Sequence, residues 1–203
     1  VPVMERLAEL DVLAQIHPGL SWRPEMAAAF RRLSALLEDD VWRDALQDES
    51  PASVRFALWL APLAEEVREA VMARLKVRKS TREEVEGAVQ LARQLQERPA
   101  GVRPSQVEKT VRPFEQRPRI QLAARAVLGD DPAGELLDRY RVEWRHVETV
   151  LDGNDLREMG LDPGPQYAVL LDRLLAARLD GEVSTEGEER ALLEKLVEEE
   201  AVG

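Results

Sequence analysis

The chain has 203 residues, a formal net charge of −11 and no cysteine. The lack of cysteine excludes disulfides, thiolate metal ligands and cysteine nucleophiles, and no apolar run approaches the ~20 residues that a membrane helix needs. The first residues lack a basic region followed by an apolar stretch, so we expect no signal peptide, no membrane partner and a cytoplasmic protein.

Apolar residues recur at helical spacing along almost the whole chain, and no stretch alternates with a period of two for long enough to predict a strand. Ala, Leu, Glu and Arg are abundant, and these residues lose little on entering a helix. We therefore predict an all-α fold. A helical bundle body spans residues 1–148, and a smaller helical tail spans residues 149–203.

The first helices are bounded by residues that favour turns or helix ends. A leucine stripe over residues 7–14 ends at His17-Pro18-Gly19, Pro24 opens the next helix, and Asp39-Asp40 suits the start of a short one. Ser50-Pro51 begins an unusually apolar segment, which we expect at the centre of the core. Its predicted core residues are Phe56, Leu58, Trp59 and Leu60.

Proline- and glycine-rich connections separate the helices that follow. Ser80 and Glu83 have the spacing of a capping box, which predicts that a helix starts there. Later helices are predicted to open at Pro104, at Pro118 and after Asp130-Asp131.

Positive charge is concentrated in the middle of the chain. Residues 68–125 contain fourteen Lys and Arg against seven Asp and Glu, whereas the stretch from Val150 onward contains five basic and fourteen acidic residues. This asymmetry fits a basic face for a polyanion. It fits equally well a segment that is rich in arginine for salt bridges.

The residue sets that catalysis needs are missing from the sequence. His17 and His146 lie far apart, and we interpret both as capping or packing residues. There is no Gly-rich phosphate loop and no Asp-x-Asp pair for two Mg²⁺ ions. The adjacent pairs Asp39-Asp40 and Asp130-Asp131 are poor substitutes, because neighbouring helical residues diverge by about 100°. We therefore predict no catalytic residue, no metal site and no cofactor in this chain.

The segment from Asp152 to Pro165 is the most informative part of the sequence. Asp152 or Asn154 is predicted to cap a short helix that Gly160 ends, and Gly164-Pro165 starts the next helix. A glycine before a proline at a helix start leaves the following amides bare, so that they are able to bind a phosphate. The alternative is a plain packing motif of two helices and a turn.

This segment also carries a resemblance to a known family. The motifs Leu151-Asp152-Gly153-Asn154-Asp155-Leu156, Pro163-Gly164-Pro165 and Leu179-Asp180-Gly181-Glu182-Val183 resemble the tail of bacterial class II tRNA nucleotidyltransferases and related poly(A) polymerases. Earlier, Arg6-Leu7-Ala8-Glu9-Leu10 and Ile16-His17-Pro18 resemble the point where the neck of that family passes into its body. The long linkers and acidic character are most similar to the multidomain, A-adding branch.

The chemistry of that family resides in an N-terminal head, whose Gly-Gly-x-Val-Arg-Asp loop, Asp-x-Asp ligands and Arg-Arg-Asp motif have no counterpart here. The run from Glu38 to Arg43 imitates the Glu-Asp-x-x-Arg nucleotide-reading motif of the family. We reject it, because its spacing is one residue too long and it follows the start of the body. Mg²⁺ and ATP or CTP would be bound by the head, and we expect this chain alone to be inactive in nucleotidyl transfer.

For the body and tail, the resemblance implies a grip on tRNA or another structured RNA, in partnership with the remainder of a parent polypeptide. Such RNA is recognised by its A-form shape and its backbone phosphates. An alternative is an acidic, all-helical protein-interaction or spacer module with no RNA role, which would lack salt-sensitive RNA affinity. The residues predicted to bind RNA are Lys76, Arg78, Lys79, Arg82, Lys109, Arg112, Gly164, Pro165 and Gln166.

Overall fold

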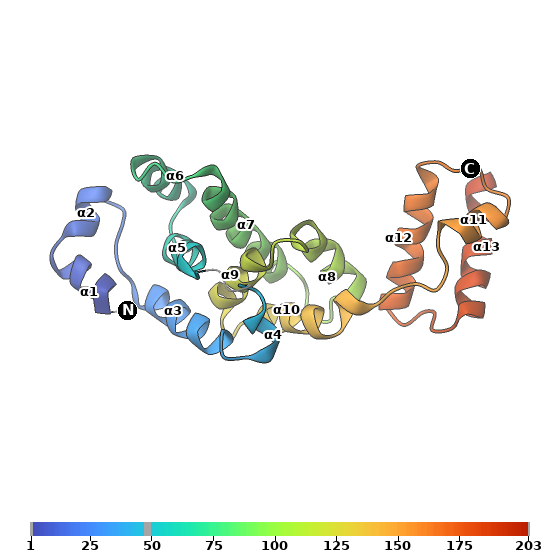
Figure 1. The fold of residues 1–203 in the computed structure, drawn as a ribbon, viewed down its shortest axis with the longest axis horizontal. Coiled ribbons are helices and arrows are strands. Elements are labelled where there is room, and N and C mark those ends of the chain that lie inside the picture. The colour runs from blue at the N-terminus through green and yellow to red at the C-terminus, as the bar shows by residue number, and fades with distance from the viewer. Residues whose placement is uncertain (1, 47–49, 203) are drawn as a thin grey trace. The chain divides into compact units, whose positions relative to one another are not determined.

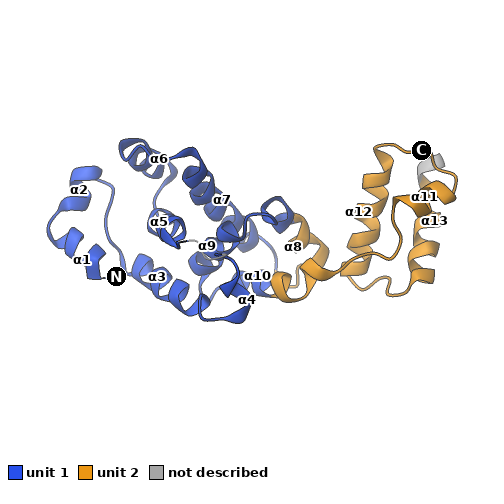
Figure 2. Cartoon of the chain, in the orientation of Figure 1, with its two compact units in different colours: residues 1–99, 110–138 blue, residues 100–109, 139–203 orange. Residues whose placement is uncertain are grey.

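A computed structural model describes residues 2–46 and 50–202, which form thirteen α-helices and two 3-10 helices without a strand (Figure 1). The predicted all-α fold is confirmed. None of the helices in these ranges is both long enough and apolar enough to span a membrane. The chain divides into two compact units, unit 1 with residues 1–99 and 110–138 and unit 2 with residues 100–109 and 139–203 (Figure 2).

The division predicted after residue 148 differs from these units. Residues 139–148 belong to unit 2, and the division falls inside two helices, α8 (Pro104–Val111) and α10 (Pro132–Val142). The predicted boundary marks a change of composition, and as a boundary between separately folding modules it stays a prediction.

Unit 1 contains the larger set of helices, apart from the parts of α8 and α10 that belong to it. They are α1 (Pro2–Glu9), α2 (Val12–Ile16), α3 (Pro24–Leu36), α4 (Asp40–Arg43), α5 (Ala52–Leu60), α6 (Glu65–Arg74), α7 (Lys79–Gln96), η1 (Arg112–Phe114) and α9 (Pro118–Leu128). Unit 2 contains η2 (Trp144–His146), α11 (Gly153–Glu158), α12 (Gln166–Leu179) and α13 (Glu186–Val202).

The core of unit 1 forms where α5, α7 and α9 pack against one another. Leu58 and Leu60 are fully buried and Trp59 is 9% exposed, so these core predictions are confirmed. The prediction for Phe56 is wrong, because its side chain is only half-buried. Phe56 lies at the edge of the core, where its ring meets Trp59 edge-on at a centroid distance of 5.9 Å.

Helix α7 approaches α9 closely at Gly87. A Cβ atom at this position would lie 2.8 Å from Ile120 Cδ1 and 3.3 Å from Phe114 Cε1. A glycine inside a helix costs about 1 kcal/mol relative to alanine. Close packing of the two helices therefore explains why the long helix α7 tolerates a glycine in its middle.

Three of the predicted helix ends are confirmed by side-chain hydrogen bonds. Asp39 accepts from the Val41 amide at 2.8 Å, Asp131 accepts from the Ala133 amide at 2.9 Å, and His17 Nδ1 accepts from the Gly19 amide at 3.0 Å. At Asp39 and Asp131 a short polar side chain satisfies an amide that the helix start leaves unpaired, whereas His17 stabilises the turn after α2.

The predicted capping box at Ser80 and Glu83 is wrong. Helix α7 begins one residue earlier, with Arg78 as an N-cap that makes no side-chain cap hydrogen bond. Glu83 instead accepts from Arg117 at 3.2 Å. With Arg78 as the N-cap, Ser80 lies in the first turn of the helix and is not the residue that caps it.

The core of unit 2 is a cluster of leucines from the segment before α11, from α11 itself and from α12 and α13: Leu151, Leu156, Leu170, Leu174, Leu193 and Leu196. Asp152 caps α11 through a hydrogen bond from the Asn154 amide at 2.6 Å, and the chain reverses after α11 at Gly160, with φ of +89°. Both predictions for this segment are confirmed.

Two buried carboxylates hold the motifs of unit 2 in place. Glu189 is fully buried and accepts from the amides of Val150 and Leu151 at 2.8 and 3.1 Å and from Arg178 at 2.7 Å. Asp180 accepts from the amide and hydroxyl of Ser105 at 2.9 and 2.8 Å. These residues therefore stabilise the fold of unit 2.

Replacement of Trp59 by alanine should lower the free energy of unfolding by about 3–5 kcal/mol, because the packing of a large buried ring is removed. Trp59→Phe should cost clearly less, since the indole Nε1 has no hydrogen-bond partner among the described residues. Chemical denaturation followed by circular dichroism measures both. Equal costs for the two variants would contradict the proposed packing role.

Replacement of Gly87 by alanine should lower stability by about 1–2 kcal/mol, because overpacking against Ile120 costs about 1–3 kcal/mol and exceeds the gain in helix propensity. Gly187→Ala is the matched control, since Gly187 also lies in a helix but a Cβ there meets nothing within 4 Å. That control should raise stability by up to about 1 kcal/mol. A stabilising Gly87→Ala would contradict the close approach.

Candidate nucleic-acid interface

The predicted basic cluster lies at the junction of α6 and α7. Lys76 follows the end of α6 in a left-handed conformation, with φ of +52°. Its amide donates to Ala73 O and the next amide, of Val77, donates to Met72 O, both at 3.0 Å. This is the hydrogen-bond pattern of a Schellman turn, in which the left-handed residue is usually glycine.

An open groove of about 640 Å³ lies between the first turns of α5 and α7. In the part of the chain that the structure describes, its lining contains two cations, three hydroxyl groups and one aromatic ring, and no carboxylate. The N-cap residues of α5 and α7, Pro51 and Arg78, make no side-chain cap hydrogen bond, although Ser50 Oγ accepts from the Ala52 amide at 3.3 Å. The lining residues are Ser50, Ala52, Ser53, Phe56, Lys76, Val77, Arg78 and Thr81.

The four residues of the predicted cluster have different surroundings. Arg82 Nε donates to Val77 O at 3.2 Å and so braces the turn, while Lys79 lies 3.8 Å from Glu83. Lys76 and Arg78 are exposed, and no carboxylate of the described ranges lies within ion-pair distance of either. These two residues, which both line the groove, are thus the members best able to bind an anion.

The other predicted RNA-binding residues do not line this groove. Lys109 is exposed on α8 and Arg112 is half-buried in η1. Gly164, Pro165 and Gln166 are in unit 2, at the start of α12. A common RNA-binding surface for all of these residues stays a prediction.

The start of α12 is less open than predicted. Pro165 is the N-cap, and Gln166 Nε2 donates back to Asp162 O at 2.7 Å. The amide group of Gln166 occupies the space beside Gly164 that a Cβ atom would need. A phosphate bound to these amides would have to displace the Gln166 side chain, so phosphate binding here also stays a prediction.

Much of the positive charge in residues 68–125 is bound to carboxylates. Arg68 makes two hydrogen bonds to Glu86, at 2.7 and 2.8 Å, and Arg125 lies 2.9 Å from Asp138. The salt-bridge interpretation of this segment therefore holds for many of its arginines. The groove between α5 and α7 retains cations that these pairs do not neutralise.

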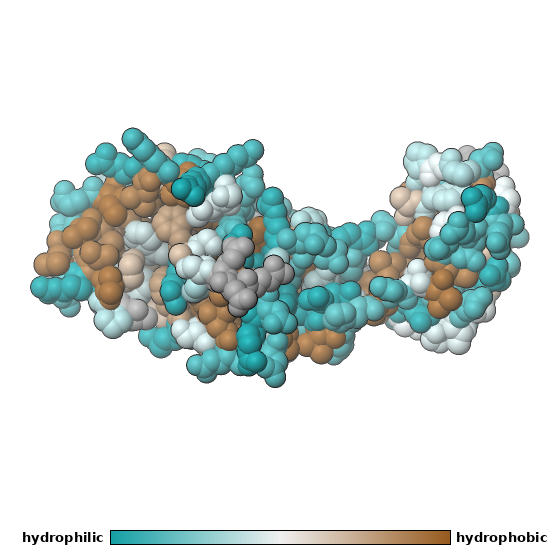
Figure 3. Space-filling view, in the orientation of Figure 1, coloured by the Kyte–Doolittle hydropathy of each residue, from teal (hydrophilic) through white to brown (hydrophobic). Residues whose placement is uncertain are grey.

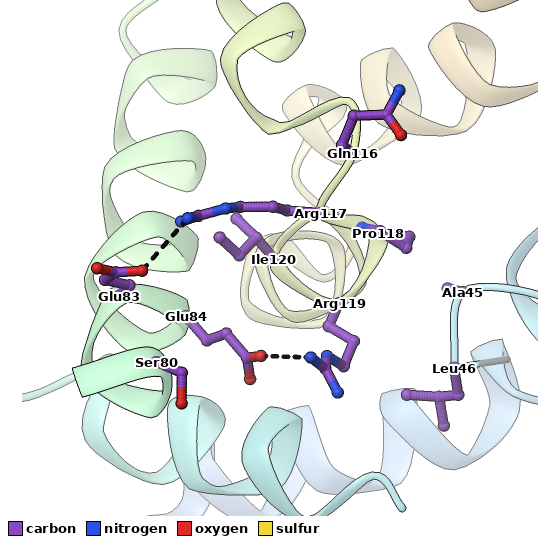
Figure 4. Close-up of a pocket in the computed structure, with 10 residues that line it drawn as sticks. All are labelled: Ala45, Leu46, Ser80, Glu83, Glu84, Gln116, Arg117, Pro118, Arg119 and Ile120. Carbon is purple, nitrogen blue, oxygen red and sulfur yellow. Dashed lines mark hydrogen bonds and ion pairs between the residues drawn. The ribbon is translucent and has the colours of Figure 1, made fainter. Parts of the chain in front are cut away.

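A second hollow, of about 320 Å³, lies at the start of α9. Figure 4 shows Arg117 and Arg119 reaching Glu83 and Glu84 of α7, at 3.2 and 2.9 Å. Glu84 Oε2 is buried without a hydrogen-bond partner among the described residues. Because each arginine faces a carboxylate, this hollow suits a polyanion less well than the α5–α7 groove.

The sequence prediction missed Phe56, Ser53 and Thr81 as residues of the groove. Phe56 belongs to an almost continuous apolar run, and serine and threonine near helix starts usually act as caps. No pattern in the sequence predicted that the first turns of α5 and α7 lie beside the same groove. Among the residues that the structure describes, no group of three His, Asp or Glu is placed to hold a metal ion.

A curated protein and several solved structures are similar to this chain. No protein-family model matches the chain. A curated A-adding tRNA nucleotidyltransferase of Geobacter sulfurreducens is 26% identical over 208 residues, covering 98% of this chain and 23% of its own length. The resemblance indicated by the sequence motifs is confirmed.

Solved structures of CCA-adding enzymes superpose on nearly the whole chain. An apo form has a TM-score of 0.69 at 20% identity, over 97% of this chain and 45% of its own. The Thermotoga maritima enzyme, solved in complex with tRNA, has a TM-score of 0.65 at 21% identity, over 95% of this chain and 47% of its own. The fold is shared with these enzymes. The chain spans about a quarter of the curated relative and just under half of the solved chains.

Replacement of Lys76 by glycine should raise the free energy of unfolding by about 0.5–1 kcal/mol. The left-handed conformation costs an L-residue about 1–2 kcal/mol, which exceeds the entropy that glycine loses on folding. Asp11→Gly is the matched control for the effect of the backbone conformation, because Asp11 is also left-handed, with φ of +56°. Thermal denaturation of both variants measures the gain, and a destabilised Lys76→Gly would contradict it.

Proposed function

We propose that this chain is the RNA-binding body and tail region of a template-independent RNA nucleotidyltransferase. It holds a structured RNA such as tRNA by its backbone, while catalytic residues elsewhere in a longer polypeptide act on the 3′ end. The observation that carries this proposal is the shared fold with CCA-adding enzymes, one of which was solved with tRNA bound.

The groove between α5 and α7 supports the proposal independently of the relatives. Lys76 and Arg78 present positive charge beside the starts of α5 and α7, whose N-cap residues make no side-chain cap hydrogen bond, and cations and helix starts both attract phosphate groups. RNA binders are usually basic, whereas this chain has a net charge of −11. Local concentration of cations at one groove reconciles an acidic chain with an anionic partner.

An apolar patch on unit 1 supports a second partner, the remainder of the parent polypeptide. Figure 3 shows brown, hydrophobic surface over α1 and α2. Val3, Leu10 and Val12 are 71%, 55% and 38% exposed there. Contiguous exposed apolar surface of this kind marks a contact with another protein part.

Replacement of Lys76, Arg78 and Lys79 together by glutamine should weaken tRNA binding by a similar factor for different RNA sequences. The slope of log affinity against log salt should fall by about 0.7–0.9 for each phosphate that the variant no longer binds. Fluorescence titrations at three salt concentrations measure both quantities. Lys76→Gly alone should weaken binding, whereas Asp11→Gly should not.

The matched control replaces three other exposed cations, Arg6, Arg93 and Lys195, each of which lies within 4.0 Å of a glutamate. This control removes the same formal charge but should leave the salt slope unchanged. If the wild-type chain does not bind tRNA at low salt, or if both triple variants behave alike, the protein-interaction alternative is favoured.

A further inference from the structure

Phe56 is half-buried at the wall of the α5–α7 groove, although an apolar ring gains more by complete burial. Its orientation is held by Trp59, whose ring packs against it at an interplanar angle of 71°. A rigid, partly exposed aromatic ring beside cations is a surface on which a planar base stacks. The ring therefore adds a recognition element that phosphate binding alone does not need.

Other residues of the lining are suited to an anion. Lys76 and Arg78 contribute charge, and Ser53 and Thr81 contribute hydroxyl groups. Ser50 is partly used within the protein, since its hydroxyl accepts from the Ala52 amide at 3.3 Å. The groove thus combines an aromatic ring with cations and hydroxyl groups.

The volume of the groove is compatible with an organic anion. About 640 Å³ lies within the roughly 300–1,000 Å³ typical of sites for organic ligands. A nucleotide has the two chemistries that these lining residues suit, a planar base and a phosphate. A phosphate without a base would leave the Phe56 ring unused.

We propose that this groove binds one unpaired nucleotide of a structured RNA, with its base stacked on Phe56 and its phosphate at Lys76 and Arg78. The inference rests on the proposed function in taking RNA as the partner. The nucleotide must be unpaired, because bases inside an A-form stem are stacked on one another and only unpaired bases are free to meet an aromatic side chain.

The test compares two RNA hairpins that share one stem, with and without a single bulged nucleotide. The wild-type chain should bind the bulged hairpin about five to ten times more tightly, as expected for one base stacked on an aromatic ring. Phe56→Leu, which keeps an apolar side chain without a ring, should abolish this difference. It should leave affinity for the fully paired hairpin unchanged.

Phe30→Leu is the matched control, because Phe30 is also half-buried and also packs edge-on against a tryptophan, Trp22, at 5.3 Å. It does not line the groove and should keep the preference for the bulge. A 2-aminopurine base placed in the bulge provides a second readout. Its fluorescence should be quenched by the wild-type chain and by Phe30→Leu but not by Phe56→Leu.

The ways in which the proposal can fail are distinguishable. Equal wild-type affinity for both hairpins, with salt-sensitive binding intact, would overturn the nucleotide site and leave the proposed function standing. Absence of binding to either hairpin and to tRNA would overturn both. If free AMP binds the groove more tightly than the bulged hairpin does, the occupant is a free nucleotide and the assignment to RNA is wrong.

Discussion

The close approach of α7 and α9 at Gly87 is the constraint on which the candidate interface depends. Because Ile120 occupies the space of a Cβ atom, these helices lie nearer to each other than larger side chains would permit. Helix α5 packs against both, and two hydrogen bonds from Arg68 to Glu86 tie α6 to α7. The packing of these helices therefore positions the first turns of α5 and α7, which line the groove.

Local signals in the sequence predicted local structure well. Asp39 and Asp152 cap helices as expected, because a short polar side chain at a helix start acts within two or three residues. Predictions that depended on contacts with distant parts of the chain were less accurate. Ser80 has no capping role, because α7 begins at Lys79. Phe56 lies at the edge of the core, because a continuous apolar run hides which face of α5 is covered.

Buried charge was the least predictable feature. Glu189 lies in a glutamate-rich segment and resembles its exposed neighbours in sequence, yet it is fully buried and binds two backbone amides and Arg178. Likewise, a count of cations in residues 68–125 did not distinguish arginines in salt bridges from the cations that line the groove. Only the three-dimensional arrangement shows which charges are already compensated and which remain for a partner.

The left-handed backbone at Lys76 has a consequence for how such sequences change over time. Glycine is the residue that this turn favours on conformational grounds alone. In a lineage that no longer needs the Lys76 side chain, this position should therefore change to glycine, and the protein should become more stable as a result. A basic residue retained at this turn in distant homologues would indicate selection for binding an anion. A glycine at the same position would indicate that this selection had ended.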